Sequence, residues 1–123
     1  MTTYVKKSIT EHELQKQIVQ LFRMRGFQVF VLDAMTGAGY FSQRDPRRFA
    51  FIADLKARGY TKGQPDLCVV RNRAVFIELK RGRGGHASPE QKDMWKWLTD
   101  HGHQAFIIKS VVEALAIADN PSN

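Results

Sequence analysis

The sequence predicts a single α/β domain with a mixed central sheet and helices on both of its faces. Short runs rich in β-branched and aromatic residues alternate with helical periodicity, in the order α-β-α-β-β-α-β-α. Two neighbouring strands are separated by only three residues, so they form an antiparallel hairpin. At 123 residues the chain can bury one core. We expect one domain over residues 1–123, with its core at about 10–115 and frayed ends.

The composition indicates an intracellular protein with a polyanionic partner. The formal net charge is +7 and the sequence pI is about 9.9, which favours nucleic acid over a membrane. Neither a bilayer-length apolar run nor a signal peptide is evident, so we expect a cytoplasmic location and no membrane partner. The single cysteine, Cys68, excludes an internal disulfide, and the four scattered histidines form no zinc pattern.

The first helix is expected to begin after Thr10. Thr10 and Glu13 have the spacing of a capping box, and the helix ends at Gly26, followed by a strand over residues 27–32. At 100° per residue, Glu11 lies on the same face as the apolar stripe. Glu11 therefore either complements the helix N-terminus or belongs to a site. The stripe consists of Leu14, Ile18, Leu21 and Phe22.

The second helix is expected to be basic on its surface. Asp45 caps it, Pro46 occupies its first position and Gly59 ends it. Phe49, Ile52, Ala53 and Leu55 are expected to pack on its inner face. The cations of this region either hold DNA phosphates or form an ordinary solvated surface. They are Arg44, Arg47, Arg48, Lys56, Arg58 and Lys62.

The hairpin carries the acidic residues that point to chemistry. Its first strand follows Gly63-Gln64-Pro65-Asp66, its turn is Arg71-Asn72-Arg73, where Asn tolerates a positive φ, and its second strand is Val75–Lys80. The period of two places Glu78 and Lys80 on one side, and strand pairing brings Asp66 near them. Two carboxylates suit Mg²⁺ or Mn²⁺ in phosphodiester hydrolysis, with Lys80 orienting the nucleophile. A cross-strand ion pair is the alternative interpretation.

The remainder of the chain supplies a basic loop and two helices. Arg81 and Arg83 lie in a glycine-rich segment that could follow a phosphate backbone. Ser88 caps the next helix, and Gln91 at its third position either completes that cap or reaches the site. A buried strand over residues 105–108 precedes a last helix that is capped by Ser110 and ends at about residue 118.

Taken together, the Gly-x-Pro-Asp segment, Ile77-Glu78-Leu79-Lys80 and Ser88-Pro89-Glu90-Gln91 resemble the VRR-NUC branch of the PD-(D/E)XK nucleases. The resemblance runs from about residue 10 to 115 and implies a restriction-endonuclease-like fold, as in stand-alone domains of bacteriophages. It implies metal binding by Asp66, Glu78 and the Leu79 carbonyl, with a further acid from the first helix, Glu11 or alternatively Glu13. It also implies that Gln91 contacts the lysine or the phosphate.

The activity that this resemblance implies is a Mg²⁺- or Mn²⁺-dependent DNA endonuclease without a small-molecule cofactor. Stand-alone members are similar to Holliday-junction resolvases, so we expect branched DNA as the substrate and a homodimer as the active form. A nickase, or a flap or repair nuclease without junction preference, is the first alternative. A non-catalytic DNA-binding module is the second, although a module that only binds has no need for acids facing a polyanion.

Overall fold

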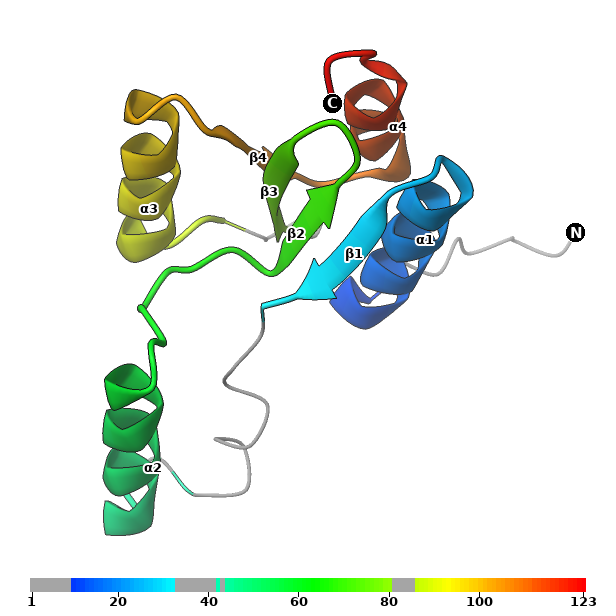
Figure 1. The fold of residues 1–123 in the computed structure, drawn as a ribbon. Helices are drawn as coiled ribbons and strands as arrows, with labels where there is room; N and C mark the ends of the chain where they lie inside the picture. Colours follow the sequence, from blue (N-terminus) through cyan, green and yellow to red (C-terminus); the bar gives the residue numbers. More distant parts are fainter. Residues whose placement is uncertain (1–9, 33–41, 43, 81–85) are drawn as a thin grey trace, which may run out of the picture.

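The computed structural model describes residues 10–32, 42, 44–80 and 86–123, and its elements follow the predicted order (Figure 1). The helices are α1 (Glu11–Met24), α2 (Pro46–Ala57), α3 (Pro89–Asp100) and α4 (Val111–Asp119). The strands are β1 (Gln28–Val31), β2 (Leu67–Val70), β3 (Ala74–Leu79) and β4 (Gln104–Ile108). Because each expected helix and strand is present, the α/β fold class is confirmed.

The four strands form one mixed sheet in the order β1-β2-β3-β4. β1 pairs with β2 and β2 with β3 in antiparallel fashion, whereas β3 and β4 are parallel. The parallel pair follows from the crossover through α3, since two parallel strands cannot be joined by a tight turn. β3 is therefore a central strand with neighbours on both sides, and β1 and β4 are the two edges.

The hydrophobic core lies between the sheet and the pair α1 and α4. Side chains of one sheet face, such as Leu67, Val75 and Ile77, pack with Ile18 and Phe22 of α1. α3 lies on the opposite side, and Figure 1 shows it next to β4 and away from α1 and α4. The predicted arrangement of helices on both faces is thus confirmed, with the main core on the α1 and α4 side.

The predicted helix starts are also present. The side chain of Thr10 accepts a hydrogen bond from the Glu13 amide, and the Glu13 carboxylate accepts one from the Thr10 amide, which completes the capping box. Asp45 accepts from the Arg47 amide at the start of α2. Gly26 and Gly59 follow α1 and α2 with φ values of 86° and 111°, as the left-handed ends of helices require.

Most of the apolar side chains that were predicted to pack on the inner face of α2 are not buried. Of its apolar residues only Leu55 is buried, and the side chain of Phe49 is 65% exposed. In Figure 1 the helix stands apart from the sheet. The prediction was wrong because helical spacing shows which residues share a face, but it does not show that another element covers that face.

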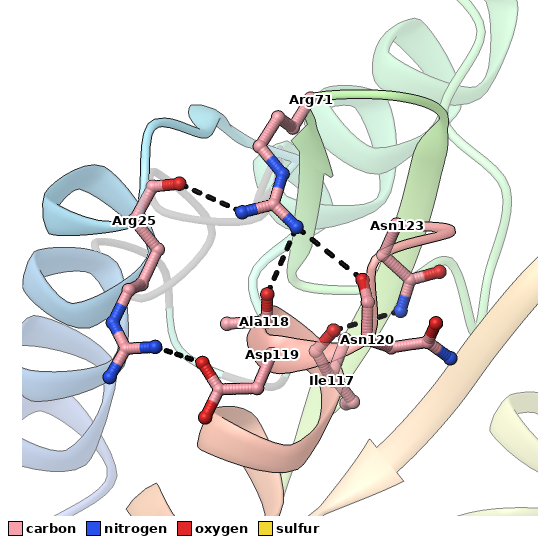
Figure 2. Close-up of polar contacts among 7 residues, drawn as sticks. All are labelled: Arg25, Arg71, Ile117, Ala118, Asp119, Asn120 and Asn123. Atoms are coloured by element: carbon pink, nitrogen blue, oxygen red, sulfur yellow. Dashed lines mark hydrogen bonds and ion pairs between the residues drawn. The ribbon is translucent and has the colours of Figure 1, made fainter.

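The C-terminal end is docked rather than frayed, which corrects the expectation for residues 119–123. Asn123 is 1% exposed and its side chain donates to the Ile117 carbonyl, while its own carbonyl accepts from the Asn72 amide. Figure 2 shows Arg71 reaching the carbonyls of Arg25, Ala118 and Asn120. The hairpin turn is thereby tied to α1 and α4.

The turn differs from the prediction in one further respect. Asn72 does not adopt a positive φ; every described residue with a positive φ is a glycine. Its side chain donates instead to the Pro121 carbonyl, so the asparagine serves a tertiary contact. Among the described residues, no helix has the length and apolar character needed to cross a membrane.

Candidate active site

Asp66, Glu78 and Lys80 come together where β2 begins and β3 ends. The strand register pairs Leu67 with Ile77, which places Asp66 opposite Glu78. The Asp66 carboxylate accepts a hydrogen bond of 2.8 Å from the Leu79 amide, and the Lys80 ammonium lies 3.4 Å from Oε1 of Glu78. The juxtaposition predicted from the hairpin is therefore present, because side chains two residues apart share a face and opposed residues meet across it.

Glu78 is a buried acid in an unusual electrostatic environment. Its side chain is 8% exposed, and burial together with the negative charge of Asp66 raises its pKa to about 7, against the favourable charge of Lys80. Oε1 accepts hydrogen bonds, but Oε2 is buried without a hydrogen-bond partner among the described residues. A buried carboxylate oxygen without a donor is costly, and a bound cation would compensate for it.

Gln91 serves both the helix cap and the site. Its amide oxygen accepts from the Ser88 backbone, and Ser88 accepts from the Gln91 amide, which completes the capping box. Its side-chain nitrogen donates to Oε1 of Glu78 at 2.5 Å. Capping and contact with the site are thus compatible, because the amide group has both an acceptor and a donor. The site residue that Gln91 contacts is Glu78, whereas the resemblance implied the lysine or the phosphate.

Gly63 allows α3 to approach the site closely. It has a φ of 88°, and a Cβ at this position would clash with the Glu90 carbonyl oxygen and lie 2.9 Å from the Gln91 amide nitrogen. A side chain here would push away the helix start that carries Gln91. In the sequence Gly63 stands out only as part of a motif, because its steric role depends on the packing of α3.

Gln64 is a positioning residue that the sequence patterns did not reveal. Its side chain accepts from the Thr61 amide and donates to the Leu32 carbonyl. The Leu32 amide in turn donates to the Asp66 carbonyl at 2.7 Å. These bonds hold the end of β1 beside Asp66. A glutamine between the glycine and the proline of the motif was the available signal, but its partner Leu32 lies 32 positions away.

The helix acids are not part of a closed metal cage. Glu13 takes part in the α1 capping box, and Glu11 is exposed rather than buried at the end of the apolar stripe. Within the described residues, no group of three His, Cys, Asp or Glu side chains is arranged to hold a metal. Asp66 and Glu78 nevertheless suit a hard divalent cation, which takes one or two carboxylates and keeps several waters.

The cations predicted to bind DNA have different environments. Arg47 forms an ion pair with Asp45 at 2.7 Å, and Lys62 lies 3.1 Å from a carboxylate oxygen of Glu90. The pairing of Arg47 with Asp45 raises the pKa of the arginine and lowers the pKa of the aspartate. Local pairing thus competes with phosphate contact at both cations. Arg44 is exposed and Arg48 is half-buried, whereas residues 81 and 83 lie outside the described part.

Comparison with known proteins connects this geometry to a fold. No family profile matches the sequence, and neither does any curated protein. Three chains of solved structures do match. One, described as a VRR_NUC domain, has a TM-score of 0.62 at 19% identity, with 90% of this chain and 96% of the other covered. A VRR_NUC domain protein has a TM-score of 0.66 at 21% identity, covering 90% of this chain and 86% of the other. The chain therefore has the fold of a VRR_NUC domain.

Proposed function

We propose that this protein is a metal-dependent endonuclease that hydrolyses DNA phosphodiester bonds. The observation that carries the proposal is Glu78, a buried carboxylate with one oxygen lacking a partner among the described residues, held between Asp66, Lys80 and Gln91. A purely structural ion pair would not need a second acid that raises the pKa of the first. The VRR_NUC-like fold and the net charge of +7 support the same class of activity.

Each residue of the site has a distinct role in this proposal. Asp66, Glu78 and the Leu79 carbonyl would hold Mg²⁺ or Mn²⁺, which keeps several waters in its coordination shell. The bound cation would supply a Lewis acid for the phosphoryl oxygens and a more acidic water. Lys80 orients that water and offsets the charge that develops on the phosphate. Gln91 holds Oε1 of Glu78, which leaves Oε2 for the cation.

We further propose branched DNA as the substrate and a homodimer as the active form. Two symmetric copies would cut opposing strands, as resolution of a four-way junction requires. The support is the likeness to junction resolvases expected from the motif.

The residue test uses Glu78→Ala with Lys96→Ala as a control on the exposed surface of α3. We expect Glu78→Ala to lose cleavage of labelled DNA while binding in chelator is kept or tightened, because an acid that faces the phosphate is gone. Lys96→Ala should retain cleavage. Normal cleavage by Glu78→Ala would remove Glu78 from the mechanism.

The substrate test compares a labelled four-way junction with a linear duplex of the same sequence, in Mg²⁺, in Mn²⁺ and in chelator. Paired, metal-dependent nicks confined to the junction are the expected result. Equal cutting of both substrates would make the protein a general nuclease, and tight binding without any cutting would make it a DNA-binding module.

A further inference from the structure

We propose that an open groove between α1 and the edge strand β1 binds the phosphate backbone of DNA outside the carboxylate site. The groove has a volume of about 710 Å³ and is lined by basic and apolar side chains. The basic residues are His12, Lys16 and Arg23, and the apolar residues are Val19, Met24 and Val31. Among the described residues, no acidic side chain lines it.

The basic residues form one line along α1. They are separated by four and seven residues, so at 100° per residue all three lie within about 40° of arc, and at a rise of 1.5 Å they span about 16 Å. A strand of duplex DNA carries a phosphate about every 3.4 Å along the axis. The line of basic residues is therefore about as long as five consecutive phosphates of one DNA strand. This length allows the three side chains to contact one strand of the backbone.

The two cations of this line differ from their neighbours in their pairing. Neither Lys16 nor Arg23 has an ion pair with another described residue, whereas Arg25 is paired with Asp119. Several cations of α2 and α3 are paired in the same way, including Arg58 with Asp54 and Lys96 with Asp100. Lys16 and Arg23 can thus engage external anions without breaking such a pair.

The surrounding surface favours a nucleic acid over a second copy of the chain. Met24 is 77% exposed and Val31 is 57% exposed, and this apolar surface alone would suit a protein partner. A symmetric interface through the groove, however, would place two sets of the same basic residues against each other. DNA instead meets the positive charge with phosphates and the apolar side chains with sugars.

The groove and the carboxylate site lie near the same end of the sheet. Val31 lines the groove, and the next residue, Leu32, donates its amide to the Asp66 carbonyl. The start of α1 also lies beside the end of β1 in Figure 1. Val31 pairs with Leu67 and faces α1, whereas Asp66 and Glu78 face the α3 side. DNA that is bound at both the groove and the carboxylate site would pass over the end of β1.

Because its partner is DNA, this inference rests on the proposed function, and its test separates binding from cleavage. Binding of a fluorescent duplex is measured by anisotropy in chelator over a series of salt concentrations. The groove variant is Lys16→Gln/Arg23→Gln. Its control is Lys92→Gln/Lys96→Gln, which removes the same charge from exposed positions of α3. Melting temperatures of both variants confirm that they are folded.

We expect the groove variant to bind about tenfold more weakly than the control near 0.1 M salt. The magnitude of the slope of log K against log salt concentration should be about 2 smaller for the groove variant than for the control. The reason is that two phosphate contacts are lost, and each contributes about 0.9 to the slope. Equal affinity and slope for the two variants would overturn the inference, even if the wild type cleaves DNA. The inference would also be overturned if the wild type were a dimer and the groove variant a monomer that binds DNA with unchanged affinity. A wild type that binds through the groove but never cleaves would refute only the proposed function.

Discussion

At the scale of single residues, the raised pKa of Glu78 makes the stability of the metal-free protein depend on pH. The unfolded carboxyl has a pKa near 4.5 and the folded one about 7, so between these values the folded state binds more protons. Stability should therefore decrease as pH rises from about 5 to 7.5, by up to about 3 kcal/mol. Urea unfolding at several pH values measures this. Glu78→Gln should remove most of the slope; an unchanged slope would place its origin elsewhere.

Gln91 and Ser88 allow the cap and the site to be separated. Ser88→Ala should cost about 1 kcal/mol of stability and leave cleavage largely intact, because only the cap is lost. Gln91→Ala also removes the donor to Glu78, so its cleavage rate should fall at least tenfold below that of Ser88→Ala. Cleavage rates and unfolding midpoints measured together decide this. Equal rates in the two variants would reduce Gln91 to a capping residue.

At the scale of elements, the contact between Gly63 and the start of α3 positions the two halves of the site. Gly63→Ala combines a positive φ, costing about 1–2 kcal/mol, with a backbone clash of about 1–3 kcal/mol more. Gly102→Ala is the matched control, since its φ is 83° and nothing lies within 4 Å of the added Cβ among the described residues. Unfolding free energies should show the larger loss for Gly63→Ala, accompanied by weaker cleavage. Equal losses would show that α3 can move without cost.

At the scale of the whole molecule, Arg71 connects the hairpin turn to both helices of the main core face. Its guanidinium donates to the carbonyls of Arg25 and Ala118 at 2.9 and 3.0 Å (Figure 2). It also lies 4.2 Å from the ring centroid of Phe27. Arg71→Met keeps the aliphatic stem but leaves those carbonyls without this donor. We expect a loss of about 2 kcal/mol.

The control for Arg71 is Arg58→Met on α2. Arg58 forms an exposed ion pair, so its substitution should change stability by about 0.5 kcal/mol or less. Thermal or urea unfolding of the two variants tests the comparison. A similar small effect at both positions would show that residues 119–123 stay docked without Arg71.

Local patterns in the sequence specify the element order, the helix caps and the hairpin register. Thr10 and Ser88 cap their helices as expected because capping depends on residues only three positions apart. Asp66 meets Glu78 for a similar reason, since a short turn dictates which strand residues face each other. The candidate carboxylate pair can therefore be predicted from the amino-acid sequence alone.

Tertiary packing, by contrast, sets which faces are covered and which polar groups are satisfied. The exposed face of α2, the docked Asn123 and the reach of Gln64 to Leu32 each depend on residues far apart in the sequence. The same is true of Oε2 of Glu78, which has no hydrogen-bond partner among the described residues, and of the groove along α1. Burial and charge compensation are properties of the assembled packing, so periodicity and spacing along the chain cannot specify them.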